Sequence, residues 1–336
     1  MKNELEKFYC GKKILITGGR GYLGSNLTSL LKDIDCHIVR LGKSEEPPKE
    51  RKGTAEIEDI VCDIRESEVW ENVLDGIDIV FHFAAQTSVY VADERSVDDL
   101  EINVLPMVQL LETCKRNNCK PIILFAGTVT ETGMPIKLPV DESHPDKPVT
   151  TYDLHKLMAE NYLKYFSEQG IVKGAILRLA NVYGPGPKSS SADRGILNVM
   201  IRKALQGEDL TLYGKGDNLR DYIYVTDVVN AFLMAAKRVE ALNGQHFVIG
   251  TGEGYTLQEA FSLGTECVKR KAGIDVKIVN VDSPTLQSAI ESRNFVADPK
   301  KFIDITGCKP GINLIKGIDQ TIEYLSQKQP ALSQSD

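Results

Sequence analysis

Tyr152 and Lys156 have the chemistry of a proton-transfer pair, and they lie four residues apart. This spacing places both side chains on one face near the start of a helix predicted over residues 152–167. A tyrosine with a pKa of about 10 is a poor base at neutral pH, whereas a nearby lysine ammonium favours the phenolate. Thr128 follows a predicted strand and offers a hydroxyl to the same substrate oxygen. We therefore predict that Thr128, Tyr152 and Lys156 are catalytic; the alternative for Thr128 is that it only completes its own turn.

The elements that must position these residues alternate along the first half of the chain. Short β-branched runs predict strands, and the longer amphipathic segments between them predict helices. The expected strands cover 13–17, 37–41, 55–61, 78–83, 121–125 and 174–179, with helices ending near 31 and covering 97–115 and 152–167. This alternation predicts an α/β fold with a Rossmann-type doubly wound parallel sheet. Ligands of such sheets bind beyond the carboxyl ends of the strands, where Thr128 is expected.

The pattern changes after Asn181, where Gly, Pro and Ser residues mark a loop followed by mixed helix and short strand. The β-prone run 222–225 predicts a return of the chain to the main sheet. We therefore expect a dinucleotide-binding domain from 1–180 plus about 219–250. A smaller substrate-binding domain is expected from about 181–218 plus 251–327, and the polar residues 328–336 are expected to form a flexible tail.

A glycine-rich turn follows the first predicted strand and opens a helix. Its glycines, Gly18, Gly21 and Gly24, permit a tight turn, close approach of a pyrophosphate, and close packing of the helix on the strand. The N-terminus of the helix then presents unpaired N–H groups and a partial positive charge to the phosphates. The turn therefore predicts an NAD(P) site, which also includes Arg20, Tyr22 and Leu23.

The end of the second predicted strand bears on the choice of cofactor. Sites that prefer NAD usually carry an acidic residue there for the ribose 2′-hydroxyl, and this chain has Gly42 instead. Arg20 and Lys43 are placed to neutralise a 2′-phosphate, so NADP(H) is favoured over NAD(H); the alternative is that both are solvated surface cations. Asp63, after the third strand, is either an adenine contact or the N-cap of the next helix.

The overall composition excludes several classes of protein. A net charge of −7 disfavours a nucleic-acid surface, and no apolar run is long enough to span a membrane. The N-terminus lacks the apolar segment of a signal peptide. The seven cysteines form no C-x-x-C pair, which predicts reduced thiols, no metal site and a cytoplasmic location.

The ordered set of motifs resembles the extended short-chain dehydrogenases, specifically the nucleotide-sugar epimerase/dehydratase family. The resemblance runs from about residue 12 to 325. The matching segments are TGGRGYLG (17–24), GIDIVFHFAAQTSV (76–89), Asn103, Thr128, Tyr152-x-x-x-Lys156, LRLANVYGPG (177–186), LYGKGDNLRDYIYVTDVV (212–229) and RNFVADPKK (293–301).

The resemblance implies further site residues. Tyr152 and Lys156 are expected to contact the cofactor, together with Ile64, Phe83, Ala84, Ala85, Gln86, Asn103, Leu179 and Val182. The substrate residues are expected to be Thr128, Thr130 and Tyr152 at the sugar, with Asn181, Arg220 and Arg293 holding the diphosphate. For the two arginines, the alternative is a surface salt bridge. The family also implies a homodimer.

Two departures from the family pattern narrow the predicted reaction. Dehydratases carry an acidic pair directly after the threonine, whereas this chain has Val129 and Thr130, so dehydration is not expected. Gly42 weakens the tight NAD binding on which a 4-epimerase depends. The leading hypothesis is therefore NADPH-dependent reduction of a nucleotide-linked 4-keto-6-deoxy sugar. The alternative is an NAD-dependent nucleotide-sugar 4-epimerase, and a third hypothesis is a non-catalytic nucleotide-sensing protein. The base, the sugar and the stereochemistry are not predicted, since the loop 188–196 expected to line the sugar pocket has no readable pattern.

Overall fold

A seven-stranded parallel sheet forms the larger part of the computed structural model, which describes residues 2–43, 53–187, 195–282 and 288–328. The strands lie in the order β10-β6-β5-β4-β1-β2-β3. They are β1 Lys13–Thr17, β2 His37–Gly42, β3 Glu56–Val61, β4 Ile79–His82, β5 Ile122–Thr128, β6 Lys173–Leu179 and β10 Gln245–Ile249. Every neighbouring pair is parallel. The predicted Rossmann-type α/β fold is confirmed.

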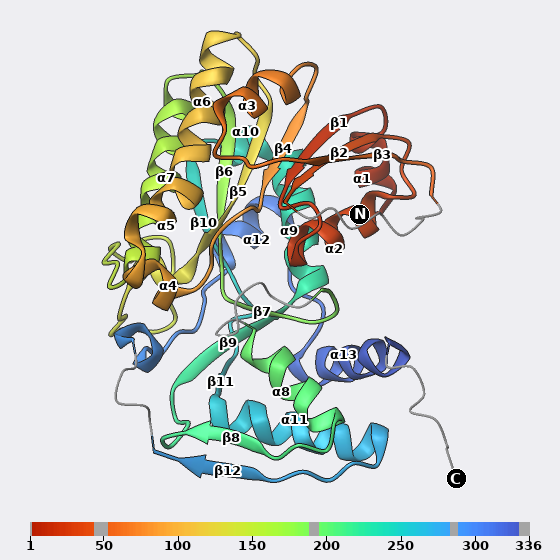
Figure 1. Ribbon diagram of the computed structural model, residues 1–336, viewed down its shortest axis with the longest axis vertical. Helices are drawn as coiled ribbons and strands as arrows, with labels where there is room; N and C mark the ends of the chain where they lie inside the picture. Colours follow the sequence, from red (N-terminus) through yellow and green to blue (C-terminus); the bar gives the residue numbers. More distant parts are fainter. Residues whose placement is uncertain (1, 44–52, 188–194, 283–287, 329–336) are drawn as a thin grey trace.

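Helices cover both faces of this sheet, which explains why its strands are apolar along most of their length. On one face pack α1 Lys2–Tyr9, α2 Tyr22–Leu31, α9 Val225–Lys237, α10 Val239–Leu242 and α12 Lys300–Thr306. The other face packs against α3 Ser67–Val73, α6 Leu105–Arg116 and α7 Thr151–Glu168 (Figure 1). Next to α7 lie α4 Val89–Glu94 and α5 Ser96–Asn103.

Two predicted elements differ from the structure. The single helix expected over 97–115 is divided at Val104 into α5 and α6, and Pro106 stands in the first turn of α6. A proline lacks the N–H that a continuous helix requires, so the chain restarts there. The run 222–225 does not return to the main sheet. Most of it belongs to β9, Leu219–Tyr224, and the main sheet is instead completed by β10.

The smaller part of the molecule lies beyond the carboxyl ends of the main strands (Figure 1). It contains the sheet β11-β9-β7, formed by Gly254–Thr256, Leu219–Tyr224 and Asn181–Tyr183, and the pair β8 Leu210–Tyr213 with β12 Ile278–Val281. These pack with α8 Ile196–Leu205, α11 Leu257–Ala272 and α13 Leu314–Lys328 around a separate apolar core. The short 3-10 helices are η1 Val129–Thr132 and η2 Ala289–Ser292. The division into the two predicted domains stays a prediction. Of the flexible tail, residues 329–336 lie outside the described residues, as do 188–194 of the predicted sugar-pocket loop.

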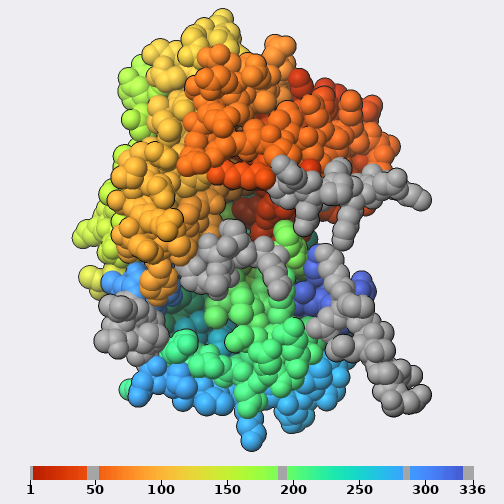
Figure 2. Space-filling view, viewed as in Figure 1, coloured from red at the N-terminus to blue at the C-terminus, as the bar shows by residue number. Residues whose placement is uncertain are grey.

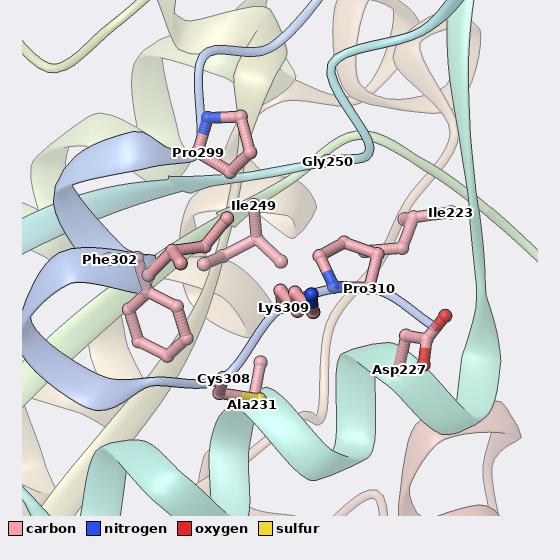
Figure 3. Close-up of a pocket in the computed structure, with 11 residues that line it drawn as sticks. Ile223, Asp227, Ala231, Ile249, Gly250, Pro299, Phe302, Cys308, Lys309 and Pro310 are labelled. Carbon is pink, nitrogen blue, oxygen red and sulfur yellow. The ribbon is translucent and has the colours of Figure 1, made fainter. Parts of the chain in front are cut away.

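None of the described helices is long and apolar enough to cross a membrane. A cavity near the start of α9 and the end of β10 has a volume of only about 10 Å³, room for about one water molecule. Figure 3 shows its mainly apolar lining, with Ile249, Phe302 and Pro310 around it and Asp227 at one side. This cavity is therefore far too small for a nucleotide or a sugar.

Candidate active site

The order of the main strands reverses between β1 and β4, which is the point where open α/β sheets bind ligands. The glycine turn leaves β1 there, and the segment from Phe83 leaves β4 beside it. Gly18 has φ of +64°, and a Cβ on it would lie 2.9 Å from the backbone nitrogen of Ala84. The two segments therefore meet with no room for a side chain at Gly18. A ligand can then approach the backbone of the turn closely. Figure 2 shows the surface hollowed where red N-terminal residues lie between orange residues and green ones.

The turn fits the pyrophosphate of a dinucleotide. The N-cap of α2 is Gly21, which has no side chain to cap the helix, so the first N–H groups of α2 are left for a ligand. Gly24 packs on Gly18 and Gly19 without room for a Cβ. The hydroxyl of Tyr22 donates to the carbonyl of Gly184 at 2.9 Å, which ties α2 to the loop after β7. Leu23 packs against the core on the α2 face.

The segment after β4 is held by hydrogen bonds from buried groups. Thr17 accepts from the backbone N–H groups of Phe83 and Ala84, both at 3.1 Å. The Thr17 hydroxyl also lies 3.1 Å from Nδ1 of His82. His82 is buried, and this burial lowers its pKa to about 3, with a further contribution from the charge of Lys156. A neutral histidine therefore supports the segment from Phe83 to Gln86 at the switch point.

Gln86 and Asn103 belong to a buried polar network beneath this segment. The Gln86 amide donates to Asp99 at 2.7 Å, and the Asn103 amide donates to Asp99 at 2.9 Å and to the Gln86 carbonyl at 3.0 Å. The other carboxylate oxygen of Asp99 lies 2.7 Å from Nδ1 of His155. This network joins α5 to α7 directly beside Lys156. Asp99 and His155 were not predicted as site residues.

The predicted catalytic residues lie on two elements that pack against each other, β5 and α7. Thr128 ends β5, and its hydroxyl lies 2.8 Å from that of Thr130. Helix α7 begins after Thr150, whose side chain caps it, and it packs against β5 and η1. Tyr152 and Lys156 are both buried on α7. Burial lowers the pKa of Lys156 to about 8, an effect that the carboxyl groups of Glu131, Asp99 and Glu160 partly oppose.

Lys156 also contacts the aromatic ring of Phe125, with Nζ 3.9 Å from the ring centroid. The ring supplies a weak cation–π contact and holds the ammonium in place. Leu179 is in register with Thr128 on the neighbouring strand β6. That a hydroxyl, a phenol and an ammonium from these residues surround one substrate oxygen stays a prediction.

The predicted cations at the end of β2 have carboxylate partners. Arg20 lies 3.2 Å from Asp59, and Lys43 lies 3.0 Å from Asp63. Lys43 is exposed and Arg20 partly buried in these ion pairs, so the choice between a cofactor role and a surface role stays a prediction. Asp63 is not the N-cap of α3, which is Glu66; its carboxylate is held instead by Arg65 and Lys43. The hydrogen bonds from Arg65 dominate in lowering the pKa of Asp63. Ile64 is buried, and its carbonyl accepts from Trp70 at 3.0 Å.

The predicted diphosphate residues gather at β7, β9 and η2. Asn181 begins β7 in register with Tyr222 of β9, and Val182 follows it. The buried guanidinium of Arg220 donates to the backbone carbonyls of Arg293 and Glu291, and it lies 4.0 Å from the Glu291 carboxylate. Both arginines are buried, so neither lies in a fully exposed salt bridge. The hydroxyl of Tyr222 has no hydrogen-bond partner among the described residues. Burial raises the pKa of Tyr222, and the charges of both arginines partly oppose this. The sequence analysis missed Tyr222, although it stands two residues after Arg220 on the same side of the strand.

Comparisons with known proteins agree with this geometry. A family model described as the NAD dependent epimerase/dehydratase family matches residues 14–250. The chain is 30% identical over 314 residues to a Methanocaldococcus jannaschii protein named "Putative UDP-glucose 4-epimerase", covering 93% of this chain and 98% of that protein. A UDP-glucose 4-epimerase from Mycolicibacterium smegmatis is 27% identical over 94% of this chain and 99% of its own length.

Solved structures of UDP-glucose 4-epimerases are similar to this chain over most of its length. The Thermotoga maritima UDP-glucose 4-epimerase with UDP-glucose superposes with a TM-score of 0.83 at 27% identity, covering 95% of this chain and all of that chain. The Thermus thermophilus UDP-glucose 4-epimerase complex with NAD has a TM-score of 0.80 at 27% identity, with 94% of this chain and 99% of that chain covered.

Proposed function

The chain belongs to the NAD-dependent epimerase/dehydratase family, and from that premise we propose that it is a UDP-sugar 4-epimerase. It is an NAD(P)-dependent enzyme of nucleotide sugars. The sequence alone favoured a reductase over an epimerase, and the similar proteins named above favour the epimerase. The similarity to UDP-glucose 4-epimerases carries the proposal. The buried Thr128, Tyr152 and Lys156 support hydride transfer by either candidate, and Val129 and Thr130 stand where a dehydratase has acids.

The residues present fit the dinucleotide that this reaction requires. Gly18 leaves no room for a Cβ, and the uncapped first turn of α2 faces the same hollow. The cofactor, when bound, supplies reversible acceptance of a hydride from the C4 carbon of the sugar. The chain's own residues handle the proton. Tyr152 removes it from the C4 hydroxyl and later returns it, while the hydroxyl of Thr128 holds the same oxygen.

Lys156 makes this proton transfer feasible near neutral pH. Its buried ammonium favours the phenolate form of Tyr152, because an opposite charge in a poorly solvated site is only weakly screened. Arg220, Arg293 and Asn181 are proposed to hold the diphosphate, so that the sugar is free to turn its other face between the two hydride transfers. Tyr222 is placed to donate a further hydrogen bond there.

The test is direct. Purified protein is incubated with NAD and either UDP-galactose or UDP-glucose, and the interconversion is followed by chromatography of the sugars. We expect conversion in both directions and a loss of at least about 1000-fold in kcat for Tyr152→Phe. Wild-type activity in Tyr152→Phe would refute the catalytic role of Tyr152. Absence of any conversion by the wild type would instead support the hypothesis that the fold only senses nucleotides.

A second candidate, an NADPH-dependent 4-ketoreductase, is supported by one observation at the adenosine end of the site. Gly42 offers no carboxylate, and among the described residues Arg20 and Arg40 pair with Asp59, while Lys43 and Arg65 pair with Asp63. Arg65 also pairs with Glu101. Two nitrogens of the buried Arg40 guanidinium have no hydrogen-bond partner among the described residues. These two donor groups of Arg40 favour a 2′-phosphate.

The two candidates differ in the cofactor that they hold. The cofactor released from the purified, denatured protein is identified by mass spectrometry, and dissociation constants for NAD and NADP are compared. Stoichiometric NAD supports the epimerase, whereas an empty protein that prefers NADPH supports the reductase. Arg20→Asn combined with Lys43→Asp should then reverse a preference for NADP, and equal affinities in the parent would remove the reason for this candidate.

We also propose that the protein is a homodimer. Exposed apolar side chains gather on three neighbouring helices, α4, α5 and α7; they are Val91, Val97, Leu100, Leu154, Tyr162 and Tyr165. A soluble monomer rarely exposes so many large apolar side chains together. Light scattering should give twice the chain mass, and Val97→Asp with Tyr165→Asp should give monomers. A monomeric wild type would refute this proposal without touching the proposed reaction.

A further inference from the structure

We propose that Glu131 is a positioning residue, which fixes the turn carrying Thr128 against the helix that carries Tyr152 and Lys156. This inference rests on the proposed function, because that function gives Thr128 a catalytic role. Glu131 was not predicted as a site residue, and it is fully buried in η1. It lies three residues after Thr128, so one of its carboxyl oxygens reaches back to the end of β5.

The first contact of Glu131 is with the backbone of Thr128. The Thr128 N–H donates to Oε1 of Glu131 at 2.9 Å, and Thr128 in turn caps η1 with its side chain. Gly127 contributes by having no side chain, since a Cβ there would lie 3.2 Å from Arg178 and 3.3 Å from Glu131. The conformation of Thr128 therefore depends on where the Glu131 carboxyl group is held.

The second contact is with Arg178, which joins Glu131 to α7. Arg178 is buried on β6, and its Nε lies 3.1 Å from Oε2 of Glu131. The same guanidinium donates to both carboxylate oxygens of Glu160, at 2.9 and 2.6 Å. Glu160 follows Lys156 by four residues, so it lies one turn further along the same face of α7. Arg178 thus connects the turn of Thr128 with the helix of the other two catalytic residues.

Several charged side chains surround Glu131 and change the pKa of its carboxyl group. It faces Glu160 and Lys156 on α7 and Arg178 on β6; beyond these, Asp146 contacts Arg178, and Lys164 and His246 contact Glu160. Burial, and then the charge of Glu160, raise the pKa of Glu131 well above its usual value. Although burial acts in the opposite direction, Arg178 holds the pKa of Glu160 at about 2. Glu131 therefore accepts from the Thr128 N–H with Oε1, and its Oε2 lies beside the guanidinium that also holds Glu160.

Three substitutions of Glu131 separate the effects of its hydrogen bonds, its charge and its length. Glutamine keeps an acceptor and a donor without charge, leucine removes both, and aspartate withdraws the carboxyl group by one methylene. The matched control is Glu142→Leu, because the half-buried Glu142 also accepts one backbone N–H, that of Val248 at 2.8 Å, outside the catalytic set. All variants are made in the full chain and assayed with NAD and UDP-galactose.

We expect Glu131→Gln to retain most of kcat with the wild-type pH profile. Glu131→Leu should lose about 100-fold in kcat with KM changed less than about threefold, the size of effect that follows from misplacing a catalytic hydroxyl. Combining Glu131→Leu with Thr128→Val should cost no more in kcat than Thr128→Val alone, because Glu131 is proposed to act on the reaction only by positioning the Thr128 hydroxyl, which Thr128→Val already removes. Glu142→Leu should lower only the melting temperature. Where Glu131→Leu does not fold, Glu131→Asp must show a loss in kcat with an unchanged KM.

Hydrogen–deuterium exchange provides a readout that does not depend on turnover. Exchange in the segment 122–133 should be faster in Glu131→Leu or Glu131→Asp than in wild type or Glu131→Gln, with Glu142→Leu unchanged there. Unchanged exchange, or a glutamine variant as impaired as the leucine variant, would overturn the proposal for Glu131. A wild type that converts no UDP-sugar but shows the expected exchange pattern would instead reject only the proposed function.

Discussion

Replacing Gly18 by alanine tests whether the glycine turn is built for a dinucleotide. The φ of +64° at Gly18 costs an alanine about 1 kcal/mol, and its Cβ would lie 2.9 Å from the backbone of Ala84. The chain must then shift and weaken the two hydrogen bonds from Phe83 and Ala84 to Thr17, each worth about 1 kcal/mol. We therefore expect a loss of about 2–4 kcal/mol in the free energy of unfolding.

The matched control for Gly18→Ala is Gly170→Ala. Gly170 has φ of +69° but nothing within 4 Å of its Cβ position, so only the cost of the backbone conformation, about 1 kcal/mol, should appear. Urea unfolding gives the stability of each variant, and fluorescence titration with NADH gives its dissociation constant. Gly18→Ala should bind NADH at least about tenfold more weakly, and Gly170→Ala as wild type. Equal losses of stability in both variants, or unchanged NADH binding by Gly18→Ala, would refute the reasoning.

Three further predictions concern buried charges. First, kcat/KM should fall above about pH 8 as Lys156 loses its proton, and Lys156→Arg should remove this alkaline limb in a pH–rate profile. Second, His82 is neutral in the folded state and gains a proton on unfolding below pH 6.5. The free energy of unfolding should therefore fall by about 1.4 kcal/mol per pH unit between pH 6.5 and 4, and His82→Asn should flatten this slope in urea titrations. Third, Arg178→Met should cost about 3–5 kcal/mol in the same assay, because it leaves the charge of Glu160 buried without its partner; a cost below about 1 kcal/mol would contradict the pairing.

Most strands of the main sheet could be predicted because they are buried on both faces and therefore form short apolar runs between turns. The strand β10 was not predicted. The same signal fails for β9, whose alternation of Arg220, Tyr222 and Tyr224 with Asp221 and Ile223 is equally β-prone. Which sheet a strand joins depends on partners far away in the chain, here β7 and β11. The local sequence of a strand therefore does not determine which sheet the strand joins.

The catalytic residues could be proposed from spacing, because Tyr152 and Lys156 lie on one helix. The residues that hold them come from separate elements and have no local signal. Glu131, Arg178 and Glu160 belong to η1, β6 and α7, and only the packed fold brings them together. The same holds for Asp59, whose place on β3 beside Arg40 gives Arg20 a partner that the sequence could not reveal.

The choice between epimerase and reductase depends on the adenosine end of the site and not on the catalytic residues. Both reactions need a hydroxyl, a phenol and an ammonium around the C4 oxygen, so Thr128, Tyr152 and Lys156 serve either. An epimerase must retain its cofactor between two opposite hydride transfers, whereas a reductase must release it after one. Retention depends on contacts to the adenosine ribose, where Gly42 contributes none and Asp59 is already held by Arg20 and Arg40. If the protein is an epimerase, its hold on NAD must therefore come mainly from the glycine turn and the segment after β4, and Gly18→Ala should release NAD and reduce epimerisation together.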